Sequence, residues 1–101
     1  MYNITLVLKS ASTLISDGYD ISISNFGNTS LAKGGSGDTL SGILSGILAY
    51  IDINPFDAAN LGCYILGRAA EFASLDIEVE AISPLDVSNH ITNVFKEIKD
   101  E

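Results

Sequence analysis

The sequence predicts an α/β layer in which three strands are followed by three helices. A nearly continuous apolar run at residues 4–8 is typical of a strand that is covered on both faces. Alternating Ile and Ser after an Asp-Gly pair indicate a hairpin, and apolar residues at helical spacing fill much of the rest. Because the chain has 101 residues, we expect at most one small domain.

The strands are expected at residues 4–8, 13–16 and 20–24, with the Asp17-Gly18 pair in the hairpin turn. The Ile-Ser alternation gives the hairpin one polar face, so we expect it at an edge of the sheet. A fully apolar strand with no parallel partner in the chain leaves a sheet edge uncovered. We therefore expect either the C-terminal piece of a larger domain or a chain that assembles with another polypeptide.

The first helix is expected over about residues 37–51, after a polar loop at residues 25–35. Gly42 and Gly46 each cost this helix roughly 0.8–1 kcal/mol relative to Ala, so we expect another backbone to pack closely there. The alternative is a helix of mediocre sequence. Six apolar residues at spacings of three and four form its core-facing stripe: Leu40, Ile43, Leu44, Ile47, Leu48 and Ile51.

Two copies of one start signal predict the remaining helices. Asn54 and Ser83 each precede a proline and have an acid three positions further on. The second helix should end near Ser74 and the third at the end of the chain, with an exposed connection at residues 75–81. The residues expected to face the core are Ala58, Leu61, Ile65, Ala69, Phe72 and Ala73 in the second helix, and Val87, Ile91, Val94, Phe95 and Ile98 in the third.

Composition limits the classes of partner. Hydrophobic residues make up 47% of the chain, which is more than a domain of this size readily encloses. The net charge of -8 disfavours nucleic acid and anionic membranes, because both bind basic patches. The longest apolar stretch is short and broken by glycine, and no signal peptide is visible. We therefore expect a cytoplasmic protein that binds neither nucleic acid nor membrane.

The single cysteine and the single histidine suggest no site of their own. Cys63 lies in an apolar helical pattern and cannot form an internal disulfide, so we expect it in the core. His90 has no Cys or second His at a metal-ligand spacing, so we expect a surface residue and no metal site built by such a cluster.

The most informative stretch is a glycine cluster that runs into the first helix. Glycines bring backbone N–H groups close to an anion, and a helix N-terminus adds about half a positive charge. We therefore predict that Gly34, Gly35, Ser36 and Gly37 bind phosphate. Asp38 follows in the first turn, where an acid suits an anion site only if it accepts a proton or holds a metal. The alternative is that Asp38 merely caps the helix.

The run over residues 25–49 resembles the signature of the ADP/ATP-dependent NAD(P)H-hydrate dehydratases, which are members of the ribokinase-like superfamily. Residues 6–15 are similar to the strand and nucleotide-binding segment of that family. Residues 55–59 and 67–71 match its next helix. The resemblance covers almost the whole chain, and its glycine-rich run is specific.

The resemblance implies a ribokinase-like three-layer α/β fold with a mostly parallel central sheet. Residues 1–101 would form its C-terminal part, with strands and an edge hairpin followed by three helices. It also implies a reaction in which ADP or ATP, with Mg²⁺, phosphorylates the hydroxyl of hydrated NADH or NADPH. Loss of phosphate then restores the double bond.

The same resemblance implies roles for individual residues. Asp38 would contact the hydrated substrate and act as the catalytic base, and Gly37 would contact the nucleotide. For Lys9 the alternative is a solvated lysine at a strand end. The segment implied to hold the adenylate part consists of Lys9, Ser10, Ala11, Ser12 and Thr13.

Some positions depart from the family pattern. Ser10 stands where glycine is usual, and Leu66 stands where histidine is common. The N-terminal part of the family's domain is missing, so we expect an oligomer or a complementing N-terminal segment. Two other functions remain open: a ribokinase-like kinase for a small molecule such as a vitamin precursor, and a non-catalytic truncated subunit.

Overall fold

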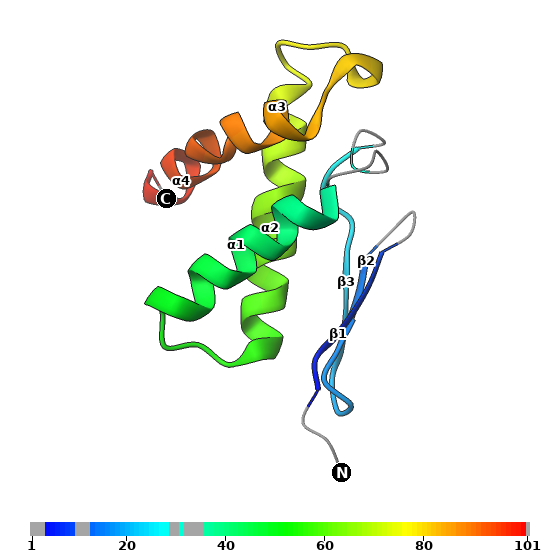
Figure 1. The fold of residues 1–101 in the computed structure, drawn as a ribbon, viewed down its shortest axis with the longest axis vertical. Helices are drawn as coiled ribbons and strands as arrows, with labels where there is room; N and C mark the ends of the chain where they lie inside the picture. The colour runs from blue at the N-terminus through cyan, green and yellow to red at the C-terminus, as the bar shows by residue number, and fades with distance from the viewer. Residues whose placement is uncertain (1–3, 10–12, 29–30, 32–35, 101) are drawn as a thin grey trace.

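The computed structural model describes residues 4–9, 13–28, 31 and 36–100. In chain order the elements are β1 (Leu6–Lys9), β2 (Thr13–Ser16), β3 (Ile21–Ser24), α1 (Ser36–Tyr50), α2 (Pro55–Ala73), the 3-10 helix η2 (Val79–Ala81), α3 (Pro84–Asn89) and α4 (Ile91–Lys99). The described residues form two layers, a sheet and a group of helices on one side of it (Figure 1). The α/β fold class is confirmed.

The strands form an antiparallel sheet in the order β1-β2-β3. The predicted hairpin joins β2 to β3, with Gly18 at a φ of 94° in the turn. The carboxylate of Asp17 accepts backbone N–H groups from Asp20 at 2.7 Å and Tyr19 at 2.9 Å, and these hydrogen bonds hold its pKa below the ordinary value. None of the described strand pairs is parallel, so these strands do not form the parallel part of the implied sheet.

One face of the sheet lies against α2. Ile15 is fully buried there, and Val7, its partner on β1, packs against the same core. On β3 this face carries Ser22, whose hydroxyl donates a hydrogen bond to the side-chain oxygen of Asn60 on α2. The polar side of the hairpin therefore faces a helix, where a polar partner satisfies it.

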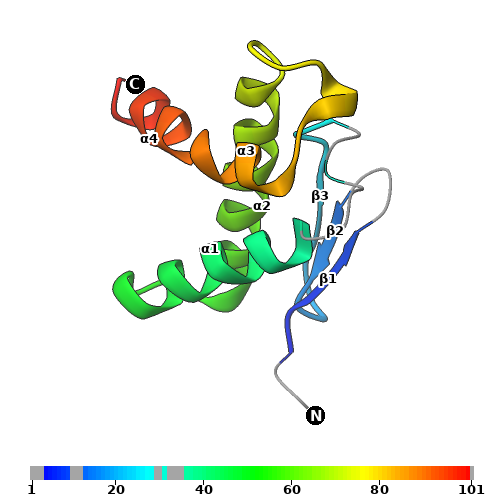
Figure 2. The ribbon, with the colours of Figure 1, turned by 45° about the horizontal axis from the view of Figure 1, so that its top comes forward.

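The opposite face of the sheet carries apolar side chains that the described residues leave open. Ile21 is 69% exposed, Ile23 is 63% exposed, and Leu6 on β1 is 51% exposed. The described helices lie on one side of the sheet only (Figure 2), so no described element covers the second face of the first strand, where the sequence predicts a cover. The hairpin does lie at an edge of the described sheet, through β3.

Helix α1 begins one residue earlier than predicted and crosses α2 (Figures 1 and 2). Leu40 and Leu44 lie over Gly62 of α2, where a Cβ would come within 2.6 Å of Leu44. The close approach expected at Gly42 and Gly46 is wrong among the described residues, because a Cβ at either would meet none of their atoms within 4 Å. The last two residues of the predicted stripe, Leu48 and Ile51, are exposed.

Helix α2 is the central element, because it contacts the sheet, α1, α3 and α4. Its start is as predicted: the side chain of Asn54 accepts the backbone N–H of Asp57 at 2.9 Å, and Pro55 occupies the first turn. Cys63 is buried as expected. Of the residues predicted to face the core, Leu61 and Phe72 are half-buried. The fully or nearly buried residues of α2 are Ala58, Ala59, Gly62, Cys63, Ile65, Leu66, Gly67, Ala69, Ala70 and Ala73.

The predicted third helix is two helices that meet at His90. The capping box of Ser83 and Asp86 starts α3 as expected, but His90 has φ -97° and ψ 2°, which ends α3 and redirects the chain into α4. The redirection buries Val94 while Phe95 and Ile98 stay exposed, contrary to the prediction.

His90 is not the surface residue that the sequence suggested. Its side chain is half-buried, with Nδ1 2.7 Å from the carbonyl oxygen of Asp86 and Nε2 3.5 Å from a carboxylate oxygen of Asp76. These contacts hold the junction of α3 and α4 against the connection that follows α2.

Candidate functional site

The first turn of α1 is the part of the predicted phosphate site that the structure describes. The N–H groups of Ser36, Gly37 and Asp38 have no acceptor within the helix, because the first four donors of any α-helix lack one. Gly37 is exposed, and a Cβ built there would meet no described atom within 4 Å. Such unpaired donors favour a negatively charged group, because the helix dipole is positive at this end.

Asp38 places a carboxylate in this same turn. Its side chain is exposed, and it is the acidic residue that α1 carries in its first turn. Ser41, one turn later, donates its hydroxyl to the carbonyl oxygen of Gly37 at 3.0 Å, so that hydroxyl is engaged by the backbone of α1. The turn thus combines backbone donors for an anion with one adjacent proton acceptor.

The end of β1 and the start of β2 lie at the same end of the molecule as this turn (Figures 1 and 2). Lys9 ends β1 and pairs in register with Thr13, which begins β2 and is half-buried. The fold therefore brings the described ends of the predicted adenylate segment toward the start of α1. The predicted site residues Ser10, Ala11, Ser12, Gly34 and Gly35 lie outside the described residues.

The loop before the glycine-rich run is fixed on α2. Gly67 of α2 touches Phe26 so closely that a Cβ there would lie 2.7 Å from the Phe26 carbonyl carbon. Gly27 follows with φ 111°. The ring of Phe26 also packs edge-on against Tyr64, with centroids 4.8 Å apart. The side-chain amide of Asn28 donates to the carbonyl oxygen of Ala70 at 3.0 Å.

A charged cluster supports this contact from the side of α4. Arg68 donates to Glu97 at two atoms, Nη2 to Oε1 at 2.6 Å and Nε to Oε2 at 3.2 Å, and pairs with Glu71 through Nη1. The two carboxylates raise the pKa of Arg68 above its ordinary value, and Arg68 holds the pKa of Glu97 below its own. The guanidinium lies 4.8 Å from the ring centre of Phe72.

Sequence analysis missed this cluster. The i, i+3 spacing of Arg68 and Glu71 was a readable signal for an ion pair on one helix face. Nothing in the sequence pairs Glu71 with Gly27 or Arg68 with Glu97, because those contacts join segments far apart in the chain.

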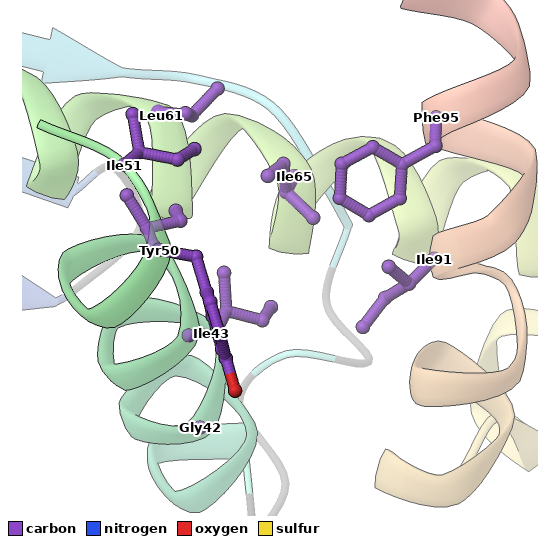
Figure 3. A pocket seen from close by; sticks show the side chains of 10 residues that line it. Gly42, Ile43, Tyr50, Ile51, Leu61, Ile65, Ile91 and Phe95 are labelled. Atoms are coloured by element: carbon purple, nitrogen blue, oxygen red, sulfur yellow. The ribbon is translucent and has the colours of Figure 1, made fainter.

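An apolar pocket of about 330 Å³ lies away from the helix start, between α1, α2 and α4 (Figure 3). Figure 3 shows Ile43 of α1 and Phe95 of α4 on opposite sides of it, with Ile65 of α2 between them. Its lining offers no charged group, so it has no features of a phosphate site. The lining residues are Gly42, Ile43, Gly46, Ile47, Tyr50, Ile51, Leu61, Ile65, Ile91 and Phe95.

In the described part of the chain, no group of three or more His, Cys, Asp or Glu side chains is placed to hold a metal ion. None of its helices has the length and hydropathy needed to cross a bilayer.

Comparison with known proteins gives one consistent family. The family model described as NAD(P)H-hydrate dehydratase matches residues 1–93. The chain is 35% identical over 95 residues to an ADP-dependent (S)-NAD(P)H-hydrate dehydratase of Cenarchaeum symbiosum, a match that covers 94% of this chain and 32% of that protein. It is 43% identical over 70 residues to the bifunctional NAD(P)H-hydrate repair enzyme Nnr of Vibrio cholerae, covering 69% of this chain and 14% of that one.

Solved structures agree with the sequence matches. YxkO of Bacillus subtilis, a member of the UPF0031 family, superposes with a TM-score of 0.87 at 30% identity, over 94% of this chain and 35% of that one. The protein SMU.573 of Streptococcus mutans gives a TM-score of 0.82 at 33% identity, over 94% of this chain and 34% of that one. The chain therefore spans about a third of the length of these structures.

Proposed function

Because the chain belongs to the NAD(P)H-hydrate dehydratase family, we propose that it forms the phosphate-binding part of an enzyme that repairs hydrated NADH and NADPH. Adenine nucleotide, ADP or ATP, is the proposed phosphoryl donor. The observation that carries the proposal is the open first turn of α1, which presents backbone donors and the carboxylate of Asp38 side by side. The cytoplasm, where these nucleotides are used, is the proposed location.

The proposed reaction has two steps. The hydroxyl of the hydrated nicotinamide ring attacks the terminal phosphoryl group of the nucleotide and loses its proton to a base. The bond between that phosphoryl group and the nucleotide breaks, which releases AMP from ADP or ADP from ATP. The phosphate then leaves with the electrons of its bond to carbon, a proton departs from the neighbouring carbon, and the ring double bond is restored. Phosphoryl transfer of this kind depends mainly on positioning and on donors aimed at the developing charge.

We assign these tasks to the predicted residues. The backbone N–H groups of Ser36 and Gly37 bind the transferring phosphoryl group, together with those of Gly34 and Gly35. Asp38 binds the substrate hydroxyl and takes its proton, a role that requires the carboxylate form. The nucleotide's adenylate part is assigned to the segment formed by Lys9, Ser10, Ala11, Ser12 and Thr13.

A magnesium ion fits this arrangement only in part. Mg²⁺ commonly binds one or two carboxylates plus substrate phosphates and keeps several waters. Among the described residues Asp38 is the acid at the start of α1, so it is the group that would hold the ion together with nucleotide phosphates. When bound, the ion would offset charge on those phosphates.

The proposed enzyme also needs partners for the open surfaces of this chain. We propose that residues 1–101 form the C-terminal part of a ribokinase-like domain, completed by an N-terminal segment or by assembly with other subunits. Support comes from the exposed apolar face of Leu6, Ile21 and Ile23 and from the length of the relatives. Such a face on a sheet is stable in water when another layer covers it.

The test is an absorbance assay of hydrated NADH with ADP or ATP. It is run with the chain alone and with the N-terminal part of the Cenarchaeum symbiosum relative added, because the chain spans 32% of that protein. We expect recovery of the reduced-nicotinamide absorbance. Asp38→Ala should lower turnover by about 10²–10⁴-fold while nucleotide affinity stays within a few-fold, because the base acts in the transition state.

Asp52→Asn is the matched control, since Asp52 is an exposed carboxylate beyond the other end of α1. It should leave turnover unchanged. Consumption of ATP only with another alcohol would replace the dehydratase by a small-molecule kinase. If the chain neither binds nucleotide nor restores absorbance under either condition, it is a non-catalytic subunit.

A further inference from the structure

One carboxylate of α2 serves two partners and helps to attach the loop at residues 26–28 to that helix, together with the hydrogen bond from Asn28 to Ala70. Oε2 of Glu71 accepts the backbone N–H of Gly27 at 2.6 Å. Oε1 of the same side chain pairs with Arg68. Glu71 is half-buried, and both of its oxygens are engaged, so the side chain has little freedom to leave Gly27.

Arg68 is itself held from a third element. Its contacts to Glu97 anchor the guanidinium on α4, 29 positions further along the chain. Tyr64, which packs against Phe26, donates its hydroxyl to the same carboxylate at 3.3 Å. Loop, α2 and α4 are therefore joined through one connected set of hydrogen bonds.

This anchoring continues toward α1. The N–H of Leu31 donates to the carbonyl oxygen of Asn28 at 3.2 Å, and its side chain lies against Gly27, 2.6 Å from where a Cβ would stand. Five positions later α1 begins, and Leu40 fixes the helix on α2, where it is 6% exposed. The start of α1 therefore lies between Leu31, which contacts the loop that is attached to α2, and Leu40, which packs against α2 itself.

We propose that Glu71 is a positioning residue: through Gly27 it fixes where the chain begins α1, and with it the first-turn residues Gly37 and Asp38. The cluster lies on α2 and α4, and no ligand contact is assigned to it. The consequence for nucleotide binding rests on the proposed function, whereas the effect on the helix start does not.

Two substitutions separate the hydrogen bond from bulk stability. Glu71→Ala removes the acceptor for Gly27, while Glu71→Gln keeps a carbonyl oxygen that can still accept that N–H. Val94→Ala is the control, because Val94 is fully buried on α4 and should destabilise the fold without touching the loop. All three are compared with the unchanged full-length chain, under conditions where each is folded.

The first readout is the amide NMR spectrum without ligand. Glu71→Ala should speed hydrogen exchange at Gly27 by about tenfold or more, as loss of a hydrogen bond to a charged group implies, and should move the Gly37 and Asp38 resonances. Glu71→Gln should keep most of the protection. If exchange at Gly27 rises but the Gly37 and Asp38 resonances stay in place, the proposal is overturned.

The second readout is the dissociation constant for ADP and for ATP. Glu71→Ala should weaken binding by about tenfold, Glu71→Gln by no more than about threefold, and Val94→Ala not at all. If Val94→Ala weakens nucleotide binding as much as Glu71→Ala does, the effect of Glu71 is one of general stability and the positioning role is overturned. A chain that binds neither nucleotide would refute the proposed function, and the NMR readout would still decide the role of Glu71.

Should Glu71→Ala fail to fold, Arg68→Lys replaces it. Lysine keeps the charge but cannot hold Glu97 at two atoms and Glu71 at a third. We expect the same direction of change at Gly27, Gly37 and Asp38, with smaller size. Unchanged resonances at all three would contradict the proposal.

Discussion

The surfaces that contact α2 and the surfaces that face away from it differ in how far their apolar side chains are buried and their polar side chains are paired. Against α2, apolar side chains such as Ile15 are fully buried, and polar ones such as Ser22 and Glu71 have partners. On the face of the sheet turned away from α2, Leu6, Ile21 and Ile23 are largely exposed. The difference indicates that most of the packing within this chain is made against α2. The outer apolar surfaces are of the kind that another polypeptide layer can cover.

Truncation of an isoleucine on each face of the sheet gives the largest contrast. Ile15→Ala should lower the free energy of unfolding by about 2–5 kcal/mol, because it leaves a cavity against α2. Ile23→Ala should change it by less than about 1 kcal/mol in the chain alone. Urea denaturation measures both. Similar losses for the two variants would show that the outer face is already packed.

Alanine in place of glycine extends the contrast to the helices. Gly67→Ala should destabilise by about 1–3 kcal/mol, since the new Cβ would overlap the backbone of Phe26. Gly46→Ala should stabilise by up to about 1 kcal/mol, because it raises helix propensity in open space. Thermal unfolding of the two variants checks the signs. A stabilising Gly67→Ala would rule out the close approach of the loop to α2.

Acidification tests the ion pair between α2 and α4. Arg68 depresses the pKa of folded Glu97 below its ordinary value of 4.5, so the stabilisation is complete above that value and is lost as the pH falls through the folded-state pKa. Glu97→Gln should therefore lose less stability than the unchanged chain between about pH 6 and about pH 3. Asp52→Asn, in the connection that precedes α2, is the control variant. Identical pH profiles for Glu97→Gln and the unchanged chain would show that the pair is not formed.

The smallest effect is expected at the hairpin turn, which faces away from α2. Asp17→Ala removes the acceptor for the N–H groups of Asp20 and Tyr19, and because the turn is exposed the loss should be smaller than that of Gly67→Ala. Asp17→Asn retains an acceptor and should be milder. Thermal unfolding orders the three variants, and a larger loss for Asp17→Ala than for Gly67→Ala would contradict this ranking.

Local signals in the sequence predicted local structure well. The Asp-Gly turn and the caps at Asn54 and Ser83 depend on residues within a few positions of one another, so they can be read without knowing the fold. The break at His90 could not be predicted, because the apolar spacing continues without interruption across this position. The break depends on the backbone conformation of His90, which the spacing does not reveal. That periodicity also placed Phe95 in the core, where the structure leaves it exposed.

The candidate site divides in the same way. Gly37 and Asp38 are neighbours in the chain, and their place in the first turn of α1 was predicted from the glycine cluster that precedes an apolar helical pattern. Their roles in binding and catalysis remain predictions. The hydrogen bond between Gly27 and Glu71 joins residues 44 positions apart. It forms only when α2 and the loop are packed together, so no local sequence pattern predicts it.

The most direct measurement is a titration of the chain with ADP and with ATP, followed at the amide resonances of Gly37 and Asp38. It is repeated with the N-terminal part of a longer relative present. The predicted result is saturable shifts at these two amides that are larger than the shift at Gly46, which lines the apolar pocket. Unmoved amides at the start of α1 under saturating nucleotide, with and without the added segment, would contradict phosphate binding there.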